Sequence, residues 1–241
     1  MFTSNIERVG AIEVKRLHLA DFTQPEGTPV AGQSCPVLAY LVLHPSGSLL
    51  FDTGFAENAS IDSIYHPVRR SLVDALAAFG VRPTDITAIA NCHLHFDHCG
   101  GNPLFPGVSI FVQRREYEAA SEPGYTLPGL ADFEGATQRL LDGETEVLPG
   151  VVLVPTSGHT PGHQSLVIQT KAGPVVLAGQ AAYSVDEYAD PRSGHVWGLK
   201  AAIDQQQYRQ SLERLRNLNP QRVYLSHDDR VWQPKADALD L

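Results

Sequence analysis

Apolar and polar positions alternate along much of the first fifty residues, a pattern typical of half-buried β-strands. The alternation runs over 12–19 and again over 36–44, where a Pro-Ser-Gly turn leads into the apolar run 48–51. From 68 to 79 the apolar residues recur at helical spacing and stop at Gly80, which predicts a helix over 68–79. This part of the chain therefore predicts strands of one sheet followed by a helix.

The middle of the chain predicts strands that alternate with helices and loops. Residues 86–91 form an apolar run typical of a buried strand, and 108–112 form another before a predicted helix at 114–120. The next segment, 121–135, is rich in glycine and proline, which favours a loop and makes the segment a candidate lid.

The second half repeats this arrangement. Further strands are predicted at 146–148, 151–155, 164–169, 174–178 and 222–226, and an amphipathic helix is predicted at 205–218. The segments 47–52 and 173–180 look like equivalent hairpin-and-strand units, which indicates a weak internal duplication. Because sheets and helices bury their apolar faces against one another, we expect two facing sheets with helices outside.

Length and composition favour a globular protein with a large core. The 241 residues are 43% hydrophobic, and we interpret 1–241 as one domain. The formal net charge of −9 argues against a nucleic-acid surface, because phosphate binding needs clustered lysine and arginine. No apolar run approaches the roughly 18 residues of a membrane span, and no secretory signal is visible. Three cysteines fit a reducing compartment, so we expect a cytoplasmic protein without a membrane partner.

Metal-ligating side chains are concentrated between positions 93 and 98. His93, His95, Asp97 and His98 fall within these six positions. Neutral imidazole and carboxylate are ligands that zinc selects, whereas a core without a metal would have to desolvate all four side chains. The alternative is a solvated polar loop. The buried strand predicted just before them delivers the cluster to a sheet edge, so metal chemistry is the first hypothesis.

Two further histidines stand directly after predicted strands. His159 lies in a Gly-His-Thr-Pro-Gly-His turn, and His227 lies in Ser-His-Asp at the end of the last predicted strand. His163 closes the turn and could orient it as a neighbour of a metal ligand. We interpret His195, in a glycine-punctuated segment, as a plain loop histidine.

Together these motifs resemble the metallo-β-lactamase superfamily. The resemblance rests on the His-x-His-x-Asp-His run, the turn around His159, the terminal Ser-His-Asp and the strand-end Asp52, and it covers about 36–228. It implies an α+β four-layer αβ/βα sandwich, in which two mixed sheets face each other with helices outside and a metal site at one edge. It also implies two Zn²⁺ ions, the first held by His93, His95 and His159 and the second by Asp97, His98 and His227.

Finer details resemble the N-acyl homoserine lactonase branch, whose activity is quorum quenching. They are Phe96, the turn 159–165 and the run Ala181-Ala182-Tyr183. This branch implies a metal-dependent hydrolase that opens a small-molecule lactone, or a related cyclic ester, with metal-bound hydroxide. In it, Tyr183 would hydrogen-bond the substrate carbonyl and Asp97 would pass a proton to the leaving alkoxide. A homodimer is expected only by analogy with relatives.

One position departs from the family pattern. Gln180 stands where the family places an aspartate that bridges the two metals. Glutamine still offers a carbonyl oxygen, but it removes one negative charge from the site. We therefore predict that two ions bind and that at least one is held more weakly. Three alternatives remain: a mononuclear enzyme, a catalytically altered ligand-binding relative, and a thioesterase of the glyoxalase II type.

Overall fold

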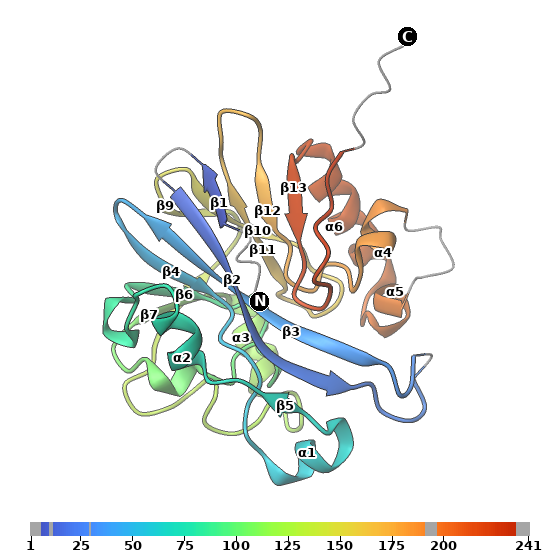
Figure 1. Ribbon diagram of the computed structural model, residues 1–241. Coiled ribbons are helices and arrows are strands. Elements are labelled where there is room, and N and C mark those ends of the chain that lie inside the picture. Colours follow the sequence, from blue (N-terminus) through green and yellow to red (C-terminus); the bar gives the residue numbers. More distant parts are fainter. Residues whose placement is uncertain (1–5, 10–11, 29, 191–196, 235–241) are drawn as a thin grey trace.

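Two mixed β-sheets form the centre of the computed structural model, which describes residues 6–9, 12–28, 30–190 and 197–234 (Figure 1). The larger sheet has eight strands, seven of them in the order β1-β2-β3-β4-β6-β7-β8, with β5 paired to β2. These strands are β1 (Ile6–Val9), β2 (Ile12–Thr23), β3 (Ser34–His44), β4 (Gly47–Phe51), β5 (Val68–Arg69), β6 (Ala88–Ala90), β7 (Ser109–Gln113) and β8 (Thr137–Leu141). Neighbours from β1 to β4 are antiparallel, whereas β4, β6, β7 and β8 run parallel.

The second sheet has five strands in the order β13-β12-β11-β10-β9. Its strands are β9 (Thr145–Leu148), β10 (Val151–Pro155), β11 (Gln164–Ile168), β12 (Val175–Leu177) and β13 (Arg222–Tyr224). All of its neighbours are antiparallel except β12 and β13, which are parallel. Both sheets therefore contain a hairpin whose second strand pairs in parallel with a later strand: β3-β4 with β6, and β11-β12 with β13. This agrees with the predicted internal duplication.

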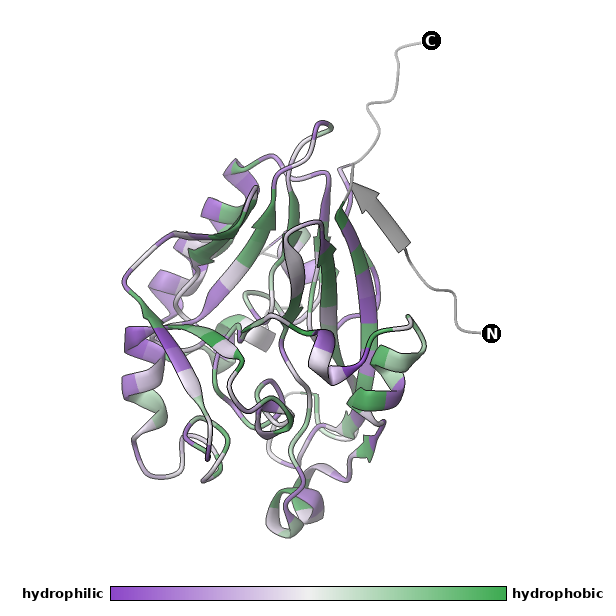
Figure 2. Ribbon diagram, turned by 90° about the vertical axis from the view of Figure 1, so that its left-hand side faces the viewer, coloured by the Kyte–Doolittle hydropathy of each residue, from purple (hydrophilic) through white to green (hydrophobic). Residues whose placement is uncertain are grey.

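Helices lie outside the two sheets. They are α1 (Ala59–Tyr65), α2 (Leu72–Ala77), α3 (Arg114–Ala120), α4 (Val185–Ala189), α5 (Trp197–Ala201) and α6 (Gln205–Asn217). Apolar side chains of the two sheets meet in a central core, Phe51 and Leu153 among them. A second core joins α2 to the larger sheet, and a third joins α6 to the smaller sheet. This layering confirms the predicted αβ/βα sandwich, and Figure 2 shows the hydrophobic residues concentrated along the strands.

The helix α6 illustrates how the sequence specifies a layer. Asp204 caps it, because its carboxylate accepts hydrogen bonds from the backbone nitrogens of Gln206 and Gln207 at 3.0 and 2.9 Å. Tyr208, Leu212 and Leu215 then recur every three or four residues and are buried against the smaller sheet. Prediction and structure agree here within one residue.

The helix predicted over 68–79 is shorter in the structure. Val68 and Arg69 form β5 and pair with β2, and the helix begins only after Ser71, whose hydroxyl accepts a hydrogen bond from the Asp74 backbone nitrogen. The short elements β8, α1, α4 and α5 were not predicted. Helix α1 spans only seven residues and has no fully buried residue, so its apolar pattern is short and weak. No helix in the described part of the chain is long and apolar enough to cross a bilayer.

Candidate metal centre

The predicted metal ligands gather at one edge of the sandwich. His93 follows β6, Gln180 follows β12, and His227 follows β13, so the ends of strands from both sheets deliver them. His159 lies in the turn between β10 and β11. The two sheets pack face to face, and loops that are distant in sequence therefore meet at this edge.

Three histidines form the first donor cluster. Nε2 of His93 lies 3.0 Å from Nδ1 of His95, and a donor atom of each of His93, His95 and His159 lies within 4.8 Å of the other two. The His93 and His159 rings stand edge to face with centroids 4.7 Å apart. This geometry brings together the residues predicted for a first metal.

A second donor cluster surrounds Nε2 of His98. That nitrogen lies 3.2 Å from Nε2 of His227, 3.0 Å from Oε1 of Gln180 and 3.5 Å from Oδ2 of Asp97. Oδ2 of Asp97 is also 3.6 Å from Nε2 of His227. The amide oxygen of Gln180 thus faces the same His98 nitrogen as His227 and Asp97 do.

The donor atoms fit a divalent cation. His159 is 6% exposed, and both of its ring nitrogens lack a hydrogen-bond partner among the described residues. A buried polar group left unpaired is costly, and a cation would satisfy it. Burial lowers the pKa of His93 and His159, and it lowers the pKa of His95 to about 4, so these rings stay neutral. A neutral imidazole is the form that ligates metals.

Two acidic groups neighbour the second cluster. Burial raises the pKa of Asp97, but the charges of His98 and His227 outweigh burial and hold that pKa below its usual value. Burial lowers the pKa of His98, whereas Asp97 and Asp52 together raise it to about 9. A cation at Nε2 of His98 would compete with this proton, as metal ligation generally does.

Polar contacts to Nδ1 fix the orientation of the His98 and His93 rings. Oδ2 of Asp52 lies 2.9 Å from Nδ1 of His98, and Sγ of Cys92 lies 3.1 Å from both Nδ1 of His93 and Oδ2 of Asp52. Because Nδ1 of each ring is occupied in this way, Nε2 faces the donor cluster. Cys92 was not expected at the site, and its only signal in the sequence is that it immediately precedes His93.

Tyr183 lies over the second cluster, beside a cavity. Its ring stacks on the His227 ring with centroids 5.3 Å apart and an interplanar angle of 20°. The centroid of the Trp197 ring lies 5.7 Å from that of Tyr183. A cavity of about 230 Å³ is lined by both tyrosine and histidine, together with Cys35 and Trp197. His195 lies outside the described residues.

Near the second cluster, aromatic side chains form a wall. Phe96 packs against Phe55 and Tyr65 with ring centroids 5.2 and 5.3 Å apart. Phe96 is only partly buried and precedes Asp97, so this wall borders the site rather than the central core.

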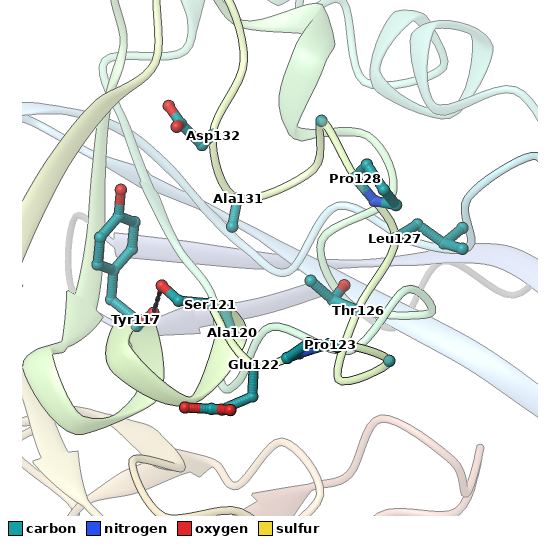
Figure 3. Close-up of a pocket in the computed structure, with 12 residues that line it drawn as sticks. Tyr117, Ala120, Ser121, Glu122, Pro123, Thr126, Leu127, Pro128, Ala131 and Asp132 are labelled. Carbon is teal, nitrogen blue, oxygen red and sulfur yellow. Dashed lines mark hydrogen bonds between the residues drawn. The ribbon is translucent and has the colours of Figure 1, made fainter.

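The loop at 121–135 also borders the site. The Tyr125 ring lies 4.8 Å from that of His95. Figure 3 shows a separate pocket of about 320 Å³ between this loop and α3, where the Ser121 hydroxyl donates to the Tyr117 carbonyl oxygen at 3.2 Å. No described histidine lines that pocket, so it is not part of the metal centre.

Comparison with known proteins identifies the family of this chain. The family model of the metallo-β-lactamase superfamily matches residues 32–227. The chain belongs to this superfamily. An N-acyl homoserine lactonase of a Bacillus species is 37% identical over 175 residues, which cover 67% of this chain and 70% of the relative. The lactonase AttM of Azorhizobium caulinodans is 29% identical over 247 residues, which cover 92% of each chain.

A solved superfamily structure extends the similarity to three dimensions. An N-acyl homoserine lactone hydrolase with the product N-hexanoyl-L-homoserine at its catalytic metal centre superposes with a TM-score of 0.75 at 28% identity. The superposition covers 92% of this chain and 95% of that one. The predicted resemblance, including its lactonase branch, is confirmed.

Proposed function

We propose that this protein is a metal-dependent hydrolase that opens the lactone ring of N-acyl homoserine lactones. The observation that carries the proposal is the stack of Tyr183 on His227, because both side chains line a cavity and His227 belongs to the second cluster of metal-ligating side chains. Relatives that share 36–37% identity are N-acyl homoserine lactonases, and this supports the same ester chemistry.

The two donor clusters would hold two divalent cations, with zinc as the ion that imidazole and carboxylate favour. His93, His95 and His159 would hold the first, and Asp97, His98 and His227 would hold the second, with Gln180 contributing its amide oxygen. When bound, such cations polarise a substrate carbonyl and lower the pKa of water. Gln180 brings a neutral amide to the second cluster where the family pattern has an aspartate, so we infer that the second ion is held more weakly than it would be with a carboxylate there.

The protein's own side chains would complete the reaction. The Tyr183 hydroxyl would donate a hydrogen bond to the substrate carbonyl oxygen, where negative charge develops. Asp97 would take the proton released by the attacking water and pass it to the alkoxide that leaves when the ring opens. Its low pKa keeps it ionised, and therefore able to accept that proton, at neutral pH.

The cavity favours a small substrate with both polar and apolar parts. Its volume is about 230 Å³, and its lining combines Tyr183, Trp197 and Val30 with polar groups such as Gln24. A lactone head group beside Tyr183 with its acyl chain extending toward Trp197 fits this mixture.

The experiment that tests the proposal measures acid release from the zinc-loaded protein with a pH indicator. The substrates are N-acyl homoserine lactones, simple lactones, acyl thioesters and β-lactams. We expect turnover of the lactones and its loss in His95→Ala, while the exposed-site control His66→Asn keeps wild-type rates. Faster turnover of thioesters than of lactones would instead support the thioesterase alternative, and binding without turnover would support a ligand-binding relative.

Besides the site residues and the identity of the ions, three further expectations from the sequence stay predictions. They are a single domain over 1–241, a cytoplasmic location and a homodimer. Light scattering on the purified protein checks the last of these.

A further inference from the structure

Glu116 of α3 has a fully buried carboxylate that the reaction does not use. Its side chain is 0% exposed, and it accepts hydrogen bonds from four donors. Oε1 accepts from the backbone nitrogen of Leu94 at 2.9 Å and from the Tyr125 hydroxyl. Oε2 accepts from the Thr160 hydroxyl at 2.7 Å and from the backbone nitrogen of Gly162 at 3.1 Å. Burial of such a group is tolerated because every neighbour can donate to it.

These four donors belong to three separate segments around the first donor cluster. Leu94 lies between His93 and His95, and its backbone nitrogen is therefore part of the segment that carries both rings. Thr160 follows His159 directly. Tyr125 belongs to the 121–135 loop and packs its ring against His95. One carboxylate thus ties together the backbones that carry all three histidines.

The turn that carries His159 is built to approach Glu116 closely. A Cβ on Gly162 would lie 2.3 Å from the backbone nitrogen of Glu116 and 2.5 Å from its Cβ. Any residue other than glycine would push the turn away from α3. The absence of a side chain at this position therefore allows the Glu116 hydrogen bonds to form.

We propose that Glu116 is a positioning residue that sets the distance between the His93-His95 segment and the His159 turn, and thereby the cation affinity of the first cluster. The inference rests on the proposed function, which assigns these histidines to a cation. It concerns one cluster only, because the Glu116 contacts reach none of the donors around His98. Loss of Glu116 should weaken one ion far more than the other.

The test is Glu116→Gln, which keeps the shape of the side chain. It replaces one acceptor oxygen by an NH₂ group, which must then face the N–H of Leu94 or of Gly162, and neither can accept a hydrogen bond. The affinity of each ion is measured by competition with a chromophoric chelator, and ligand geometry is measured by the visible spectrum of the Co²⁺-substituted protein. The matched control is Glu118→Gln, which changes an exposed glutamate on the same helix.

We expect Glu116→Gln to weaken one ion by about 10- to 100-fold, the usual effect of removing a group that orients a metal ligand, and to change the Co²⁺ spectrum. The second ion and the Glu118→Gln protein should match the wild type. If Glu116→Gln does not fold, Thr160→Val removes a single donor and should cause a smaller loss at the same ion.

Unchanged affinities and an unchanged spectrum would overturn the proposal. Equal weakening of both ions, with a lower melting temperature of the metal-free protein, would also overturn it, because Glu116 would then serve general stability. A wild-type protein that binds both ions but opens no lactone would contradict the proposed function and leave the role of Glu116 intact.

Discussion

Asp52 and Gln180 hold the His98 imidazole from opposite sides. Oδ2 of Asp52 lies 2.9 Å from Nδ1, and Oε1 of Gln180 lies 3.0 Å from Nε2. The two residues also match in the fold, since Asp52 follows β4 and Gln180 follows β12, the second strands of the two corresponding hairpins. One of these places holds a carboxylate and the other a neutral amide, so the two matching places differ in charge.

This asymmetry predicts the effect of Gln180→Asp. A second carboxylate beside His98 and His227 adds negative charge at the proposed second ion, so the affinity of that ion should rise by about 10- to 100-fold. Metal competition titrations check this, with the exposed-site variant Gln210→Asp as the control for added charge. If Gln180→Asp raises affinity but slows lactone hydrolysis, glutamine is adapted to the reaction. A loss of affinity would show that the site is built for the amide.

The unpaired nitrogens of His159 predict an unusual response to His159→Leu. In metal-free protein, removing a buried imidazole without partners should raise the free energy of unfolding by about 1 to 3 kcal/mol. The stabilisation that zinc gives the wild type should shrink at the same time, because binding to the folded state is what stabilises it. Denaturant unfolding with and without chelator measures both, beside His66→Asn as a control. A less stable metal-free variant would show that His159 has structural partners after all.

Because the Tyr183 ring stacks on His227 beside the cavity, Tyr183→Phe should lower the rate of lactone hydrolysis without lowering the metal content. Tyr183→Phe keeps the ring and its packing but removes the hydroxyl, so kcat for lactones should fall on the order of a hundredfold. Metal content should stay the same, since the hydroxyl is no part of either donor cluster. Steady-state kinetics and metal analysis check this against Tyr117→Phe. Wild-type kcat in Tyr183→Phe would remove the tyrosine from the mechanism.

The buried side chain of His163 should make the free energy of unfolding depend on pH. Its Nε2 accepts a hydrogen bond from the Gln180 backbone nitrogen at 3.0 Å, and burial, followed by the charge of His98, lowers its pKa to about 3. In the unfolded state this histidine has a pKa near 6.5. Between the two pKa values it is therefore protonated in the unfolded state and neutral in the folded state. Stability should fall as the pH drops from about 6.5 toward 3, by about 1.4 kcal/mol per pH unit for this group.

The measurement compares the metal-free wild type with His163→Gln. Glutamine can donate to Thr156 and accept from the Gln180 backbone, but it does not titrate. Between pH 7 and pH 5 the wild type should lose about 2 kcal/mol more than the variant. Parallel pH profiles for the two proteins would mean that His163 does not contribute.

The sequence by itself determined the donor types and the strands that deliver them. His93, His95, Asp97 and His98 could be proposed as ligands because ligand chemistry resides in a short run of side chains directly after an apolar strand. Helix α6 could be predicted within one residue, since its cap and its apolar face are local patterns.

Only the tertiary structure decided which distant groups meet. The packing of two sheets brings His159 beside His93 and places Gln180 at Nε2 of His98, and no local pattern encodes those distances. The same holds for Glu116, an ordinary glutamate in a predicted helix, which becomes a shared acceptor only because α3 lies beneath two loops. Side-chain chemistry is a property of single residues, whereas their spacing across strands depends on the whole sandwich.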